Sequence, residues 1–139
     1  MRFRWRAQEG SAAAELALLG PLFALLVAGL IEGAGLVQTV QVVRNAAREG
    51  ARYASIYDSD PAGRALTYLQ DTLGSRTDVT LPAKSGITVS PAPGSGAAGS
   101  SVTVTVPVTL TISAPVIQDI LGTSVPISAS ATMRIISTQ

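Results

Sequence analysis

An uninterrupted apolar segment near the amino terminus constrains this chain more than any other feature. From Leu16 to Ile31 the sequence holds no charged or strongly polar residue. At about 1.5 Å per residue this run forms roughly 24 Å of helix, slightly less than the hydrocarbon core of a bilayer. The small, uncharged residues 11–14 bring it to about the required length. The sequence therefore predicts a transmembrane helix over residues 11–32.

The composition supports membrane attachment and argues against several classes of function. Charged residues make up 14% of the chain, well below the fraction of about a quarter in typical soluble domains. The net charge is +1 and the basic residues are scattered, so the sequence lacks the basic face of a nucleic-acid binder. Cysteine and histidine are absent, which removes the thiolate nucleophile, the commonest general base and the commonest metal ligand. We therefore expect no cofactor, no metal and no small-molecule substrate.

Basic residues precede the apolar segment and predict its orientation. Arg2, Arg4 and Arg6 lie ahead of it, and basic residues favour the cytoplasmic side of a membrane. Anchoring at the lipid headgroups would account for them equally well. A removable secretory signal is the alternative, because small residues follow the apolar run in "GLIEGAG". The helical pattern continues through that stretch, so we expect the helix to be retained.

The helix should continue beyond the membrane over residues 33–57. Arg44, Arg48 and Arg52 recur at i, i+4 and i+8 and therefore share one helix face. They form either a solvated face or a set of partners for carboxylates of an adjacent subunit.

A second face of the same helix is built from small residues. Ala47, Ala51 and Ala54 make it narrow enough for close packing against a neighbour. Gly50 lowers helix propensity by about 1 kcal/mol relative to alanine. Either another backbone approaches closely at Gly50, or stability is simply lost there.

Capping residues predict a second, shorter helix. Asp60 is a good N-cap and Pro61 is favoured at the first helical position, so a helix should run from Pro61 to Leu73. Gly74 is its natural end. A further helical turn over residues 115–121 should end at Gly122.

The remaining sequence alternates with the period of β-strands. Apolar and polar residues alternate strictly over 102–112 and again over 125–135, which indicates half-buried strands with threonine toward water. Short strands are expected at 79–81 and 87–89, and a Gly/Ser/Pro-rich loop at 91–101. Pro107 cannot donate to a strand ladder, so one side of the 102–112 strand should be exposed or bulged there.

These elements predict an α+β fold. A small antiparallel sheet of three or four strands needs an apolar cover on its inner face. The second half of the long helix and the helix over 61–73 are the only candidates. The expected plan is pilin-like: a long helix, half in the membrane and half packed on the sheet, with residues 58–139 forming an extracytoplasmic domain.

Two motifs resemble a known family. The stretch "EGSAAAELALLGPLFALLVAGLIEGAGLVQ", followed by "NAAREGARYA", resembles the TadE-like family of minor pseudopilins from the tight-adherence (Flp) pilus system. The resemblance covers roughly residues 10–54. It implies that a prepilin peptidase cuts between Gly10 and Ser11 and removes the basic leader 1–10. Glu15 then becomes the fifth residue, where pilins keep a carboxylate.

The resemblance also implies partners and a location. The expected partners are the prepilin peptidase, other pseudopilins, pilus platform proteins and the membrane. The expected location is the bacterial inner membrane, crossed once with the amino terminus in the cytoplasm, with incorporation into a cell-surface pilus. No catalytic activity is implied for the chain itself.

Two carboxylates at the ends of the apolar segment require an explanation, because a charge in a membrane is costly. Glu15 could pair with the new amine of Ser11 on a neighbouring subunit and set the axial register of assembly. Pairing within one chain, or extension toward the interface, are the alternatives. Glu32 is an interfacial charge if the membrane ends at Ile31, which we favour. In a longer span it would be buried and would need a cation or a proton.

Other functions remain open on the sequence alone. A membrane-anchored enzyme would have to use aspartates, whose candidates are Asp58, Asp60, Asp71, Asp78 and Asp119. The segment 58–61 is better explained as a helix cap, and calcium binding there lacks the further oxygen ligands of a loop site. A third class is an anchored adhesin-like binding module that presents its threonine-rich sheet.

Overall fold

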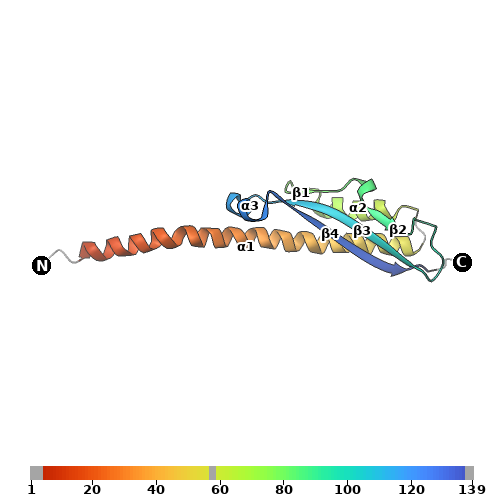
Figure 1. Ribbon diagram of the computed structural model, residues 1–139, viewed down its shortest axis with the longest axis horizontal. Coiled ribbons are helices and arrows are strands. Elements are labelled where there is room, and N and C mark those ends of the chain that lie inside the picture. The colour runs from red at the N-terminus through yellow and green to blue at the C-terminus, as the bar shows by residue number, and fades with distance from the viewer. Residues whose placement is uncertain (1–4, 57–58, 137–139) are drawn as a thin grey trace.

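The computed structural model describes residues 5–56 and 59–136. One continuous helix, α1 (Trp5–Ser55), runs the length of the molecule, and a small α+β domain lies along its carboxyl-terminal half (Figure 1). The amino-terminal half projects beyond the domain with no other element beside it. The predicted fold class, a long helix packed on a small antiparallel sheet with a short second helix, is confirmed.

The domain follows α1 in a simple order. Its elements are α2 (Pro61–Leu73), β1 (Val79–Thr80), the short helix η1 (Lys84–Gly86), β2 (Thr88–Ser90), β3 (Ser101–Thr111), α3 (Pro115–Leu121) and β4 (Ser124–Arg134). The predicted helix at 61–73 is confirmed to the residue, and the strands lie within one residue of their expected bounds. Asp60 caps α2 as expected, because its Oδ1 accepts a hydrogen bond from the Gly63 amide at 2.9 Å.

Strand β3 is the centre of a four-stranded antiparallel sheet. β4 pairs with it along its whole length on one side, while β1 and β2 share the other side. The Thr111 amide donates to the Asp78 carbonyl on the β1 side at 2.7 Å. The amide nitrogens of alternate strand residues face the same neighbouring strand, so the Pro107 nitrogen faces the same side as the Thr111 amide. At that position it lies opposite the gap between β1 and β2. The missing donor of Pro107 therefore costs no ladder hydrogen bond, and the predicted exposed side is confirmed.

The core lies between the inner face of the sheet and the helices α1 and α2. One face of β3 is buried at every second residue, as the alternation predicts. The predicted small-residue face of α1 packs against this sheet and against α2. Ala47, Ala51 and Ala54, the residues predicted for this face, are buried. Further buried residues are Val42, Val43 and Ala46 on α1 and Ala65, Leu69 and Leu73 on α2.

Gly50 is the point of closest approach between α1 and the rest of the domain. A Cβ at this position would lie 3.1 Å from the Ala65 Cβ, 3.1 Å from the Val104 Cγ1 and 3.2 Å from the Pro61 carbonyl oxygen. All three contacts are tighter than ordinary van der Waals distances. Of the two explanations open for Gly50, close backbone approach is therefore the correct one.

Gly50→Ala should destabilise the domain although alanine is the better helix former. Overpacking a tight site costs about 1–3 kcal/mol, which exceeds the propensity gain of about 1 kcal/mol. Chemical denaturation in detergent micelles, followed by circular dichroism, measures the change. Gly33→Ala is the matched control on the same helix, because no atom lies within 4 Å of its added Cβ. Equal or higher stability of Gly50→Ala would show that the close approach is not a constraint.

A polar network ties the α2–β1 connection to α1. The Arg76 Nε donates to the Asp78 carboxylate at 3.0 Å, and a second nitrogen of Arg76 forms an ion pair with the same group. Arg76 Nη1 also donates to the Thr39 hydroxyl at 3.2 Å, and this hydroxyl donates in turn to the Gly35 carbonyl at 2.8 Å. Thr39 is fully buried. The hydrogen bond and charge of Arg76 hold the pKa of Asp78 below its usual range.

The Asp78 carboxylate should make the domain sensitive to acid. A carboxylate whose pKa is lower in the folded than in the unfolded state adds stability above its unfolded pKa, at about pH 4. This stability is lost as the pH falls through the lowered folded pKa. Asp78→Asn should therefore flatten the decline of unfolding free energy below about pH 4. Asp71→Asn removes a charge from the exposed surface of α2 and is the control; an identical effect of both variants would contradict the assignment.

Candidate functional sites on the long helix

The amino-terminal half of α1 exposes an apolar surface on every side. Its large side chains are mostly solvent-exposed, with Leu18 at 78%, Phe23 at 68% and Ile31 at 68%. Within the described chain, the segment from Ala12 to Ser55 contains the one stretch that is long and apolar enough to cross a membrane, and that stretch has no buried residue. An apolar surface of this extent is far larger than monomeric soluble proteins expose. The helix therefore fits a single-pass membrane anchor.

The predicted processing and assembly residues lie at the start of this surface. Gly10 and Ser11 belong to the helical backbone of α1. Glu15 follows one turn after Ser11 and is exposed. Cleavage after Gly10 and the role of Glu15 in assembly stay predictions.

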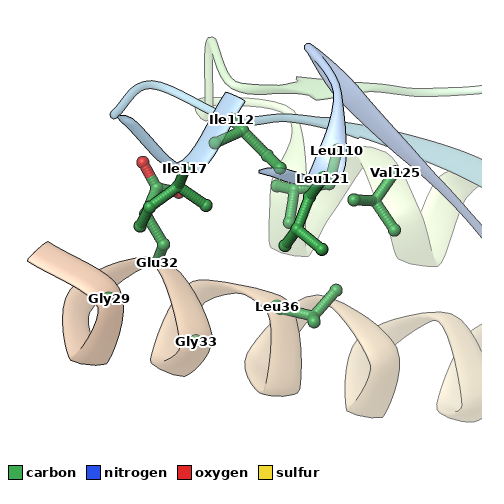
Figure 2. A pocket seen from close by; sticks show the side chains of 9 residues that line it. All are labelled: Gly29, Glu32, Gly33, Leu36, Leu110, Ile112, Ile117, Leu121 and Val125. Carbon is green, nitrogen blue, oxygen red and sulfur yellow. The ribbon is translucent and has the colours of Figure 1, made fainter. Parts of the chain in front are cut away.

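Glu32 lies at the other end of the apolar segment and contacts the domain directly. Its Oε1 accepts hydrogen bonds from the Ser113 and Ala114 amides, both at 2.9 Å. Figure 2 shows its carboxylate reaching from α1 toward α3. The interfacial location expected for Glu32 stays a prediction, but the structure adds a partner that neither expected environment included. A half-buried carboxylate is thereby compensated by two backbone dipoles.

This contact satisfies two amides at the entry to α3, where no local side chain does so. The N-cap residue of α3 is Ala114, whose side chain cannot accept a hydrogen bond, and no side chain of α3 caps it. The first amides of a helix need acceptors. Glu32 accepts from the N-cap amide of Ala114, 82 residues away, and from the preceding Ser113 amide. The sequence holds two signals of this contact: a helix start at Pro115 without a capping side chain, and the carboxylate of Glu32 in an apolar stretch. No local pattern connects them, because they lie far apart in the chain.

An apolar cavity of about 230 Å³ separates α1 from α3 next to this contact (Figure 2). Glu32 is its one charged lining residue. The other residues that line it are Gly29, Gly33, Leu36, Leu110, Ile112, Ile117, Leu121 and Val125. The hydrogen bonds of Glu32 therefore carry much of the attachment of α3 to α1.

Glu32→Ala should loosen α3 without unfolding the domain. Two amides then lose their acceptor, at a cost of about 1–3 kcal/mol if they stay shielded from water. Hydrogen exchange in detergent or lipid should show faster exchange at Ser113 and Ala114, with the amides of β3 unchanged. Glu32→Gln keeps an acceptor oxygen and should give an intermediate rate. Unchanged exchange in Glu32→Ala would mean that the carboxylate does not hold α3.

The predicted arginine face lies on α1 next to the small-residue face, and Arg44 and Arg48 border a polar pocket beside residues 128–130 of β4. Arg44, Arg48 and Arg52 are all exposed. Arg52 forms an ion pair with Glu49 on its own helix at 3.1 Å, and Arg48 donates to the Asn45 side chain at 3.4 Å. This geometry is that of a solvated face; pairing with an adjacent subunit stays a prediction.

The aspartates considered for catalysis or calcium binding lie apart. Asp58 is outside the described residues. Asp60 binds the Lys84 ammonium at 2.7 Å in addition to capping α2, and Lys84 is the main cause that lowers the pKa of Asp60. Asp78 is paired with Arg76, while Asp71 and Asp119 are exposed on different helices. Among the described residues no three acidic, histidine or cysteine side chains come together as a metal site would require.

The family match covers part of the long helix and none of the α+β domain. Residues 10–52 match the model of the TadE-like protein family. The helical segment is TadE-like. The resemblance predicted from the sequence is therefore confirmed over this segment. The match begins at Gly10 and ends in the last turn of α1, so it contains Glu15, Glu32 and the arginine face. No curated protein and no solved structure matches the chain.

Proposed function

We propose that this protein is a minor pseudopilin of a tight-adherence (Flp-type) pilus. In this proposal a prepilin peptidase removes residues 1–10, and the mature chain enters assembly through the first half of α1. The carrying observation is that the TadE-like match starts at Gly10 and lies entirely within α1. The segment that resembles the family is thus most of α1, including its apolar first half, and excludes the sheet.

The geometry of α1 supports this mode of assembly. Its first half carries apolar side chains around the whole helix and no neighbouring element covers them (Figure 1). In the membrane these side chains face lipid, and in a filament the same surface can pack against equivalent helices. One surface therefore serves both states, and the domain at the other end of α1 need not refold between them.

The carboxylate of Glu15 would set the register between subunits. After cleavage, the chain begins with a free ammonium at Ser11. An ammonium and a carboxylate are each costly in an apolar environment and compensate each other when they meet. Pairing of Glu15 with the Ser11 amine of the neighbouring subunit would stabilise one axial stagger over the others. The partners in this model are the peptidase, sibling pseudopilins and the pilus platform in the inner membrane.

Leader cleavage is the first test of the proposal. The full chain is expressed with its cognate prepilin peptidase, and the amino terminus of the product is sequenced. The expected mature protein begins at Ser11, and a catalytically inactive peptidase should leave Met1 in place. A product that still begins at Met1 with active peptidase, or that begins beyond the helix, would contradict the pseudopilin assignment and favour an anchored binding module.

The assembly role of Glu15 is tested separately from cleavage. Glu15→Ala should leave processing largely intact but strongly reduce incorporation into filaments, because the buried amine loses its partner. Immunoblotting of sheared pili measures incorporation. Glu9→Ala is the matched control, because this carboxylate is discarded with the leader. Normal incorporation of Glu15→Ala would rule out the pairing mechanism.

A further inference from the structure

Helix α3 exposes apolar side chains although it belongs to the extracytoplasmic domain. Val116 is 50% exposed, Ile120 is 74% exposed and Leu121 is 59% exposed. The outer face of the sheet is polar, with threonine and serine hydroxyls paired across β3 and β4, as in Thr103 with Thr132 at 2.8 Å. Among the described residues of the domain, the other exposed large apolar side chain is Ile136, which follows β4 and is 61% exposed. Three of the four large apolar side chains that the described part of the domain exposes therefore lie on one short helix.

The apolar side of α3 extends well past its own packing interface. At 100° per residue, its four apolar side chains form one continuous arc, and Gln118 and Asp119 lie opposite that arc. Ile117 and Leu121 line the cavity against α1, whereas Val116 and Ile120 occupy the outer part of the arc. Packing within the protein therefore explains why the inner part of the arc is apolar, but it does not explain the outer part.

The position of α3 along α1 indicates what covers the outer part. The cavity between the two helices is lined by α1 residues from Gly29 to Leu36, so α3 lies beside the end of the apolar segment (Figure 2). Leu30 and Ile31 are exposed at the same level of α1, at 66% and 68%. From Ala12 to Gly29 the helix rises about 27 Å, which is close to the thickness of a bilayer's hydrocarbon core.

We propose that α3 lies in the outer headgroup layer of the membrane that α1 crosses, with Val116 and Ile120 inserted toward the acyl chains. This inference rests on the membrane-anchoring part of the proposed function. The apolar arc of α3 is then continuous with the lipid-facing surface of α1. The polar side of α3, with Asp119, faces away from the bilayer.

Glu32 fits this arrangement as the link between the two membrane contacts. At the headgroup level its charge is partly hydrated, and the Ser113 and Ala114 amides supply the remaining compensation. The same hydrogen bonds hold α3 at a fixed height on α1. The domain therefore rests on the membrane at two points, the anchor itself and α3, which restricts its tilt relative to the bilayer.

The natural absence of cysteine makes a direct depth measurement possible. Ile120→Cys, Asp119→Cys and Leu22→Cys are each introduced into the full chain, labelled with a nitroxide and reconstituted in phosphatidylethanolamine–phosphatidylglycerol vesicles. Collision with oxygen, which concentrates in lipid, is compared with collision with a water-soluble nickel chelate. Asp119 and Ile120 are successive exposed residues that point about 100° apart around α3, one on its polar side and one on its apolar arc, so neither change disturbs the core.

We expect a lipid-type collision ratio at Ile120 and Leu22 and an aqueous ratio at Asp119, with several-fold less nickel collision at Ile120 than at Asp119. Aqueous ratios at both α3 positions, with Leu22 in lipid, would overturn the inference and leave the anchor intact. An aqueous ratio at Leu22 as well would remove the membrane anchor and the inference together. Protection of Ile120 that disappears on dilution of protein in lipid would assign the surface to a second copy instead and also overturn the proposal.

Discussion

The whole architecture depends on one helix that must satisfy two different environments along a single axis. Over its first half α1 is apolar on all sides, which suits lipid or a packed helical bundle. Over its second half one face is buried, and that face consists mostly of alanine. Because these side chains are short, the sheet and α2 approach the helix backbone closely, most of all at Gly50. The domain is thus fixed to the helix by shape over many contacts.

The transition between the two environments falls where Glu32 contacts the chain before α3. The carboxylate stands at the end of the apolar segment and is bound by amides from a distant part of the sequence. Next to it lies an apolar cavity rather than a filled core. Packing therefore contributes less at this end of the domain than around Gly50, and directional hydrogen bonds contribute more. The membrane-proximal end of the domain is consequently the part that a single substitution can release.

Local signals in the sequence predicted most of the fold, and they failed where the contacts are distant. Period, capping and turn residues located α2 and the four strands, and the position of Pro107 anticipated the gap beside β3. The contacts of Glu32 with Ser113, and of Arg76 with Thr39, join residues 81 and 37 positions apart. No periodicity encodes such pairs, because each depends on how finished elements pack. The candidate site was therefore predicted residue by residue, without its partners.

Continuity of α1 gives the proposed assembly mechanism a mechanical consequence. The helix is unbroken from its first turns to Ser55, so Glu15 and Gly50 are separated by a rigid rise of about 52 Å. A pairing that fixes the height of Glu15 against a neighbour also fixes the height of the sheet, because the close packing at Gly50 allows little sliding. The polar outer face of the sheet would then repeat along a filament at the stagger chosen in the membrane. Register specified by one carboxylate at the base of the helix is in this way transmitted to the surface of the domain.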